Sequence, residues 1–307
     1  MTTVFIDGSA GTTGLRIADR LATRNDLQLI TLSEENRKDT AARKEAINSA
    51  DIVFLCLPDP AAIEAVSLAE NPAVKIIDTS TAHRTNPEWT YGMPELCGQR
   101  ERIAKSHRIA NPGCHASGFV ALVAPLVEQG LLKADTPLTC FSLTGYSGGG
   151  KKMIAEYESA DRSPLLKAPR QYALSQQHKH LKEMIAVCGL ETAPVFCPIV
   201  ADFYSGMEVT VPLFAKDVTG TKEDIEQLYA SYYQSGLIRF DNATDPDGLL
   251  SAAAFADRDD LQVSVYGNEE RILLTARFDN LGKGASGEAI QNMNILLGVD
   301  EATGLNV

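Results

Sequence analysis

The alternation of short apolar runs with helix-forming runs restricts the fold of this sequence more than any other feature. An apolar segment, VFID, leads into a glycine-rich turn and an amphipathic stretch. Further strand-type segments follow at 27–32, 51–58 and 74–80, with helix-type segments at 38–50 and 59–70 between them. Such alternation, with continuously apolar strands, is typical of a parallel sheet covered by helices on both faces. With right-handed crossovers it predicts a doubly wound, α/β Rossmann-type domain.

The turn after the first strand has the spacing expected of a nucleotide-binding loop. Its glycines form G-x-x-G-x-x-G rather than the commoner G-x-G-x-x-G. Residues without a Cβ permit a tight turn, and the next helix then presents backbone N–H groups to a pyrophosphate. An ordinary strand-to-helix turn is the alternative. The candidate cofactor-binding residues here are Gly8, Gly11, Thr12, Thr13 and Gly14, with Ser80 at the end of the strand-type segment 74–80.

The segment after the second strand, TLSEENRKD, bears on the choice between NAD and NADP. NAD sites usually carry an acidic residue at this point, whereas NADP sites carry small or basic ones. Ser33 comes first, and Arg37 and Lys38 follow one turn later, where they could hold a 2′-phosphate. Glu34 and Glu35 favour the alternative of a solvated charged loop. We expect NADP(H).

The second half of the chain has a different pattern, and 307 residues are more than one core comfortably holds. Strand-type segments separated by loops and few helices predict a largely antiparallel sheet in an α+β substrate domain. These segments are 137–145, 193–200, 207–214, 261–267 and 271–279.

Cys114, in IANPGCHASGF, stands directly before an apolar helix-type run at 116–127. Amides at a helix start can hold a thiolate and later an oxyanion, so Cys114 is a candidate nucleophile. A buried, inert cysteine is the alternative. The remaining cysteines are Cys56, Cys97, Cys140, Cys188 and Cys197. No pair has C-x-x-C spacing, so neither a zinc module nor a disulfide framework is expected.

A nucleophilic thiol needs a base, and SQQHKHLKEM offers His178 and His180. If this segment is extended, both side chains point to one side. If it is helical, Ser175 caps the helix and His178 shares a face with Lys182. A polar turn and a metal site are the alternatives, but no third ligand supports a metal. His83 and His115 are further candidates, although we expect the side chain of His115 to diverge from the neighbouring thiol.

The charge of the chain constrains its ligands. A formal net charge of −12, without long Lys/Arg blocks, disfavours nucleic-acid binding. An anionic substrate would therefore need a local basic pocket. The segment GYSGGGKK and the cations after it are the best candidate, although a flexible loop is the alternative. The longest apolar stretch is too short to cross a bilayer, and the first residues, MTTVFIDG, show no signal-peptide pattern, so a cytoplasmic protein is expected.

Together these segments resemble the N-acetyl-γ-glutamyl-phosphate reductases of arginine biosynthesis, in their shorter form. The matching stretches are GSAGTTGLRI, DTSTAHR, YGMPEL, NPGCHASGF, GYSGGGK, QHKH and NLGKGASGEAIQNMN, in the family's order. The resemblance places the chain with the aspartate-semialdehyde and glyceraldehyde-phosphate dehydrogenases. It implies NADPH-dependent reduction of N-acetyl-γ-glutamyl phosphate through a thioester on Cys114. His180 is the implied acid/base and His178 the alternative. Longer relatives often have Tyr where this chain has His115.

The resemblance also implies further sites and an assembly. The loop before the last helix, with Asn280, Gly282 and Gly284, would line the nicotinamide end of the cofactor. The candidate substrate-binding residues are Arg84, Asn111, Gly148, Lys151 and Arg162. The returning helix would make the first domain discontinuous, with residues 1–113 and 286–307, and leave 114–285 as the substrate domain. A homodimer or homotetramer is expected.

Three other readings of the residues stay open at this point. Another acyl-phosphate reductase, acting on aspartyl or aminoadipyl phosphate, would need the same residues. A thiol acyltransferase or hydrolase would use Cys114 without a hydride, and it would not need the nucleotide-binding pattern. An NADP-binding regulator with a redox-sensitive thiol would consume no aldehyde.

Overall fold

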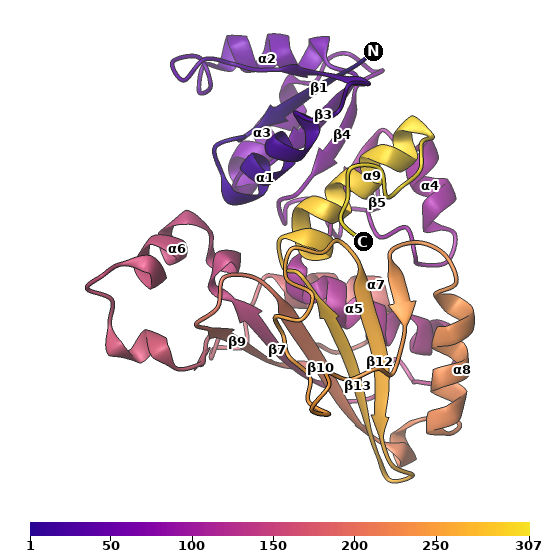
Figure 1. Ribbon diagram of the computed structural model, residues 1–307. Coiled ribbons are helices and arrows are strands. Elements are labelled where there is room, and N and C mark those ends of the chain that lie inside the picture. The colour runs from indigo at the N-terminus through magenta and orange to yellow at the C-terminus, as the bar shows by residue number, and fades with distance from the viewer. The chain divides into compact units, whose positions relative to one another are not determined.

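The computed structural model describes residues 1–307, which form two compact units (Figure 1). The first unit contains residues 1–113 and 285–305, and the second contains 114–284 and 306–307. The chain thus returns to its first unit at Ala285, and its last two residues belong to the second. No helix is both long and apolar enough to cross a membrane.

The first unit is built on a parallel sheet of six strands in the order β2-β1-β3-β4-β6-β5. The strands are β1 (Thr2–Asp7), β2 (Leu27–Ile30), β3 (Ile52–Leu55), β4 (Lys75–Asp78), β5 (Thr90–Tyr91) and β6 (Arg108–Ala110). The helices are α1 (Thr12–Leu21), α2 (Thr40–Ser49), α3 (Asp59–Leu68), α4 (Gln99–Lys105) and α9 (Gly287–Leu297). The doubly wound α/β fold is confirmed.

Both faces of this sheet are covered, and this explains why β3 is apolar at every position. Phe54 packs on one side in a buried cluster with Ile17 of α1 and Ile290 of α9. Val53 packs on the other side in a cluster with Ile47 of α2 and Ala62 of α3. Successive residues of a strand point to opposite faces, so a strand buried on both sides needs apolar residues throughout.

The second unit has seven strands in the order β11-β12-β13-β10-β7-β9-β8. They are β7 (Thr139–Gly145), β8 (Arg170–Gln171), β9 (Val195–Ala201), β10 (Met207–Phe214), β11 (Ile238–Phe240), β12 (Leu261–Gly267) and β13 (Arg271–Phe278). Only the pairs β11–β12 and β7–β9 are parallel, so the sheet is largely antiparallel, as predicted. The helices are α5 (Cys114–Glu128), α6 (Gly150–Glu158), α7 (His180–Cys188) and α8 (Lys222–Tyr232).

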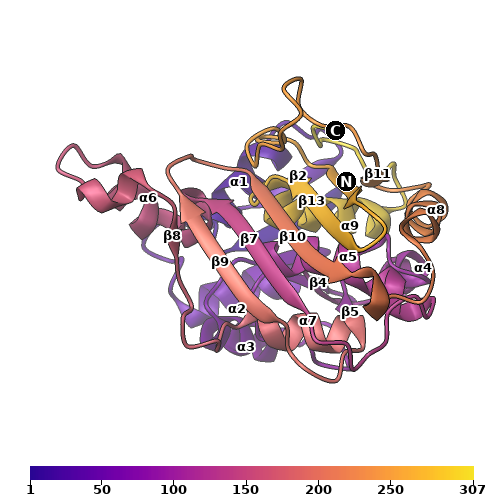
Figure 2. The same cartoon turned by 90° about the horizontal axis from the view of Figure 1, so that it is seen from below.

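One face of this sheet carries helix α5, which is almost entirely buried. A Cβ on Gly118 would lie 2.6 Å from Val209 Cγ2, so glycine lets this helix pack closely on β10. Figure 2 looks at the opposite face, where β9, β7, β10 and β13 lie uncovered by helices of this unit. Large apolar side chains on these strands are exposed there: Phe141, Val195, Phe214 and Leu273.

Two alternatives that the sequence left open for the second unit do not hold. The segment GYSGGGKK is not an irregular loop, because residues Tyr146–Gly149 form a 3-10 turn that continues into α6. The histidine segment does not begin a helix at Ser175 either. Helix α7 begins at His180, and the ring Nδ1 of His178 accepts a hydrogen bond from the His180 amide at 3.2 Å. His178 therefore precedes the helix and cannot share a helical face with Lys182.

Candidate functional site

The three glycines of the first turn have different roles. Gly8 has φ of 90°, and a Cβ there would lie 2.3 Å from the carbonyl oxygen of Cys56. A Cβ on Gly14 would lie 2.5 Å from the carbonyl oxygen of Gly8. Both positions thus require glycine for packing. A Cβ on Gly11 would meet no atom closer than 3.5 Å, which is an ordinary van der Waals distance, so packing within the protein does not require glycine at this position.

Gly11 is also the N-cap of α1, and no side chain caps this helix. The first-turn amides of α1, which include those of Thr12 and Thr13, therefore have no side-chain acceptor. Uncapped amides and the helix dipole favour an anion at this point. The turn fits the pyrophosphate of a dinucleotide.

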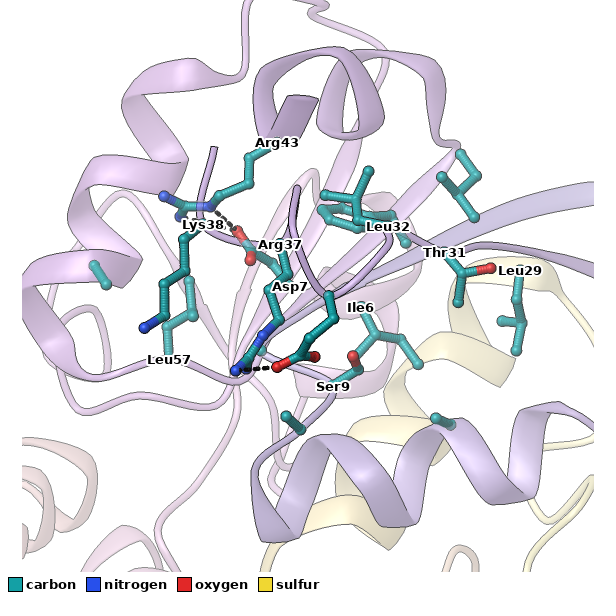
Figure 3. A pocket seen from close by; sticks show the side chains of 17 residues that line it. Ile6, Asp7, Ser9, Leu29, Thr31, Leu32, Arg37, Lys38, Arg43 and Leu57 are labelled. Carbon is teal, nitrogen blue, oxygen red and sulfur yellow. Dashed lines mark hydrogen bonds and ion pairs between the residues drawn. The ribbon is translucent and has the colours of Figure 1, made fainter. Parts of the chain in front are cut away.

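A pocket of about 320 Å³ lies beside this turn, at the carboxyl ends of β1 and β2 (Figure 3). The side chains of Arg37, Lys38 and Arg43 extend into it. Arg43 pairs with the buried Asp7 at 3.0 Å and with Glu64 at 2.8 Å. Burial raises the pKa of Asp7, although Arg43 opposes this.

The other two cations of the pocket differ in their partners. Arg37 forms an ion pair with Glu34 at 2.5 Å, whereas Lys38 forms none. Lys38 is therefore the cation of this pocket whose charge no carboxylate matches. Ser33, expected to contact the cofactor, does not line the pocket. Its carbonyl oxygen accepts from the amides of Asn36 and Arg37, so Ser33 closes the turn after β2.

The DTSTAHR loop after β4 is fixed by a buried carboxylate. Asp78 accepts hydrogen bonds from the amide and hydroxyl of Ser80 at 2.9 and 2.7 Å, and His83 Nδ1 lies 2.6 Å from it. Arg84 donates to the carbonyl oxygens of Asn111 and Thr79, at 2.8 and 2.9 Å. The guanidinium of Arg84 therefore binds the backbone of two neighbouring segments, and its contact with a substrate stays a prediction.

The side chain of Asn111 is buried and already has partners. Its Nδ2 donates to the carbonyl oxygen of Ala285 at 3.0 Å, and its Oδ1 accepts from Asn292 at 3.3 Å. Asn111 thus ties the end of β6 to the returning C-terminal segment within the first unit. Its contact with a substrate stays a prediction.

Cys114 is the first residue of α5 and is half-buried. A Cβ on Gly284 would lie 3.0 Å from the Cβ of Cys114, so glycine lets this loop approach the thiol closely. Burial raises the pKa of Cys140 and of Cys188 well above the usual range of a thiol. Thiols held in the protonated form are poor nucleophiles, so these two cysteines are not candidates.

The side chain of His115 lies beside the other two candidate histidines. Its ring centroid lies 5.7 Å from that of His178 and 5.6 Å from that of His180. His115 Nδ1 lies 2.6 Å from Ser142 Oγ, and Nε2 lies 2.6 Å from the hydroxyl oxygen of Tyr172. Sequence spacing contains no signal for this cluster of three histidines and Tyr172, because its members come from three separate segments.

Two histidines of the cluster, His115 and His178, are uncharged bases. Burial, with smaller contributions from His178 and Lys179, lowers the pKa of His115 to about 3. Burial and then the charge of Lys179 lower the pKa of His178 to about 4. His180 is buried beside them. Near neutral pH His115 and His178 are therefore neutral imidazoles, and a neutral imidazole can accept a proton from a thiol.

The expected basic pocket is less basic than the sequence suggests. Arg162 binds Asp202 through two hydrogen bonds of 2.7 and 2.8 Å, which match its charge. Lys151 and Gly148 are exposed on α6 and the 3-10 turn before it. No group of three or more His, Cys, Asp or Glu side chains could hold a metal ion.

The loop before the last helix is tightly packed. Asn280 donates to Ser147 Oγ and accepts from the amide of Gly206, both at 2.9 Å. A Cβ on Gly282 would lie 2.0 Å from the carbonyl oxygen of Arg258. These contacts give Asn280 and Gly282 structural roles within the second unit, and their contact with a nicotinamide stays a prediction.

Comparison with known proteins agrees with this two-unit organisation. Residues 3–106 match the semialdehyde dehydrogenase NAD binding domain, and residues 114–280 match the semialdehyde dehydrogenase dimerisation domain. Aspartate semialdehyde dehydrogenase II from Vibrio cholerae has a similar fold, with a TM-score of 0.74 and 16% identity over 97% of this chain and 98% of that one. Aspartate semialdehyde dehydrogenase from Candida albicans, whose structure was solved with NADP, has a TM-score of 0.65 and 15% identity over 97% of this chain and 99% of that one.

Sequence relatives are much closer. The chain is 45% identical to N-acetyl-gamma-glutamyl-phosphate reductase 2 of Nostoc sp. PCC 7120, over 98% of each chain. It is also 45% identical to the protein of the same name from Pseudomonas putida KT2440, again over 98% of each. The chain therefore belongs to the semialdehyde dehydrogenase family and, within it, to the N-acetyl-γ-glutamyl-phosphate reductases.

Proposed function

We propose that this enzyme reduces N-acetyl-γ-glutamyl phosphate with NADPH, giving N-acetylglutamate 5-semialdehyde and inorganic phosphate. The observation that carries the proposal is the thiol of Cys114 on the first residue of α5, in the unit that also holds the histidine cluster. The identity to reductases of this name supports the choice of substrate. As in those relatives, the product belongs to arginine biosynthesis.

The reaction divides into two steps at Cys114. The thiolate attacks the acyl carbon, the bond from that carbon to the phosphate oxygen breaks, and a thioester forms. When bound, NADPH supplies the hydride that reduces the thioester carbonyl. The resulting hemithioacetal loses its hydroxyl proton, its C–S bond breaks, and the aldehyde leaves the regenerated thiolate. Amides at the start of α5 are placed to stabilise negative charge on sulfur or on the acyl oxygen.

We assign the proton transfers to His180, with His178 as the alternative. Either imidazole takes the thiol proton before the attack and handles the hemithioacetal proton afterwards. His178 is the more exposed of the two, and its Nδ1 already accepts from the His180 amide, so the neutral ring carries its proton on Nε2 and can take the thiol proton only after that hydrogen bond breaks.

The first unit would hold the cofactor by its adenosine and pyrophosphate. The pyrophosphate would lie at Gly11, and the adenosine 2′-phosphate would meet Lys38 in the pocket beside it. Arg37 can contribute only by loosening its ion pair with Glu34.

The exposed apolar strands of the second unit support an oligomer. Phe141 and Leu273 are 45% and 42% exposed on the sheet face that Figure 2 shows, and a match to a dimerisation domain covers this unit. We assign this face to a homodimer, and a homotetramer would use a second surface as well. We place the enzyme in the cytoplasm, where reducing conditions keep a catalytic thiol free.

The reverse reaction tests the proposal. N-acetylglutamate semialdehyde, phosphate and NADP⁺ should give NADPH with the wild type and none with Cys114→Ala. Aspartate and aminoadipate semialdehydes serve as matched substrates and should react far more slowly. NADPH formation that continues in Cys114→Ala, or that does not need phosphate, would refute the thioester route. Faster turnover of another semialdehyde would refute the substrate.

A further inference from the structure

Asp7 and Arg43 form a buried charged pair that lines the pocket beside the glycine turn (Figure 3). Asp7 is the last residue of β1, at the carboxyl edge of the sheet where dinucleotides bind, and Arg43 lies in α2. The two residues are only 3% and 6% exposed. Charges this deeply buried are stable only where their polar atoms find partners, so the partners of each atom show what the pair still lacks.

Each member of the pair keeps hydrogen-bonding capacity that the protein does not use. Arg43 donates from Nε and Nη2 to one oxygen of Asp7, Oδ2, at 3.1 and 3.0 Å, and from Nη1 to Glu64 at 2.8 Å. These bonds use three of the five N–H groups of a guanidinium, so one N–H on each terminal nitrogen has no acceptor in the protein. Oδ1 of Asp7 accepts no hydrogen bond from the protein. The pair therefore offers a ligand one acceptor beside two donors.

The rest of the pocket suits a flat apolar ring with few polar atoms. A volume of about 320 Å³ and a mostly apolar wall are typical of small-molecule sites. The apolar side chains of the wall include Ile30, Leu32, Leu57 and Ala61. The other carboxylate that lines the pocket, Glu34, is already paired with Arg37. Asp7 is therefore the carboxylate with an oxygen left for a ligand.

An acceptor beside a donor selects among the parts of a dinucleotide. A phosphate group only accepts hydrogen bonds, and the charge of Asp7 would repel it. Adenine carries an amino group, which donates, next to a ring nitrogen, which accepts. Guanine and hypoxanthine carry an oxygen in place of this amino group, so a carboxylate would face a second acceptor. The pair thus complements adenine and disfavours both other purines.

We propose that Asp7 and Arg43 bind and select the adenine base of the cofactor. Oδ1 of Asp7 accepts from the 6-amino group, and the guanidinium of Arg43 donates to the adjacent ring nitrogen. Glu64 pairs with Arg43 but does not line the pocket, so it does not contact the base. The inference rests on the proposed placement of NADPH in this pocket and not on the proposed substrate.

Two nucleotides test this on the wild-type protein without any substitution. Isothermal titration calorimetry measures the Kd of NADPH and of deamino-NADPH, in which hypoxanthine replaces adenine. The two differ only in the base, so the ratio of their Kd values reports base recognition. Paired donor and acceptor contacts to a base edge discriminate by 1–3 kcal/mol, so deamino-NADPH should bind about 5- to 150-fold more weakly. Equal Kd values would overturn the proposal.

Asp7→Asn should narrow this ratio to about one. An amide can accept from the amino group of adenine or, after rotation, donate to the oxygen of hypoxanthine. Glu64→Gln is the matched control, because it removes a carboxylate from the same ion-pair cluster but lies outside the pocket. It should leave the ratio unchanged. A ratio unchanged in Asp7→Asn, or narrowed equally by Glu64→Gln, would contradict recognition of the base by Asp7.

Arg43→Met separates contact with the base from contact with the 2′-phosphate. NADPH and NADH share the adenine, so loss of the base contact should raise both Kd values by the same factor. A loss confined to NADPH would assign Arg43 to the 2′-phosphate and overturn its role here. If the wild type shows no reductase activity but still prefers NADPH to deamino-NADPH, the proposed substrate fails and this inference stands. If it is an active reductase that binds both equally, the inference fails and the proposed function stands.

Discussion

Lys38 should determine how strongly this enzyme prefers NADPH over NADH. It lines the pocket beside the glycine turn and forms no ion pair, whereas Arg37 and Arg43 are paired with carboxylates. A hydrogen bond to a charged group contributes about 1.5–3 kcal/mol. Lys38→Met keeps most of the apolar stem but loses this bond, so the Kd for NADPH should rise about 10- to 150-fold. The Kd for NADH should stay almost unchanged.

Two variants of the same loop serve as comparisons. Arg37 must first break its exposed pair with Glu34, which costs up to about 1 kcal/mol, so the loss of NADPH affinity in Arg37→Met should be smaller than that in Lys38→Met by a factor of up to about five. Glu34→Gln removes a repelling carboxylate and frees Arg37, so it should tighten NADPH binding.

Fluorescence titration of the purified variants with each nucleotide measures these constants, at low salt and at physiological salt because exposed charges are screened. Equal loss of NADPH and NADH affinity in Lys38→Met would refute the assignment, since the lysine would then contact a part that the two nucleotides share. A larger loss in Arg37→Met would show that the ion pair with Glu34 does not hold when the cofactor binds.

Three further expectations concern stability and assembly. Gly8→Ala should destabilise the protein by more than about 2 kcal/mol in urea unfolding, because φ is 90° and the new Cβ would meet a carbonyl oxygen. Gly11→Ala should lower the free energy of unfolding by less than about 1 kcal/mol but still weaken nucleotide binding. The free energy of unfolding should fall as pH drops from 6.5 towards 3, since the unfolded chain binds a proton that His115, with a folded pKa of about 3, does not; a slope unchanged in His115→Phe would contradict this. Phe141→Asp together with Leu273→Asp should reduce the molar mass measured by light scattering, and an unchanged mass would move the interface elsewhere.

The first unit could be predicted because its signal is local. Each buried strand is a continuous apolar run, as in β3, and a parallel sheet covered on both faces is the arrangement that suits such strands. Gly8 and Gly14 were predictable in the same way, since a tight turn before a helix needs residues without a Cβ at fixed intervals.

The details of the site could not be predicted, because they depend on residues far apart in the chain. In the sequence no carboxylate stands close to Arg162 on the side of Asp202, forty residues away, yet in the folded chain the two form an ion pair. The position of His115 depends on Ser142, which lies on another element and gives no signal of its own in the sequence. Side-chain directions at the start of a helix depend on what the helix packs against, so the sequence alone does not give the surroundings of His115.

Helix α9 belongs to the first unit but lies near the C-terminal end of the chain, and this has a consequence for folding during synthesis. Ala289, Ile290 and Met293 of this helix complete the same buried cluster as Val4 and Ile17, although they are synthesised last. A growing chain on the ribosome thus exposes the apolar surface of its first sheet until translation ends. The second unit, by contrast, has nearly all its residues by position 284 and can fold earlier. We therefore expect the nucleotide-binding unit, which is first in the gene, to be the last to mature, and to be the part of the nascent chain that most needs a chaperone.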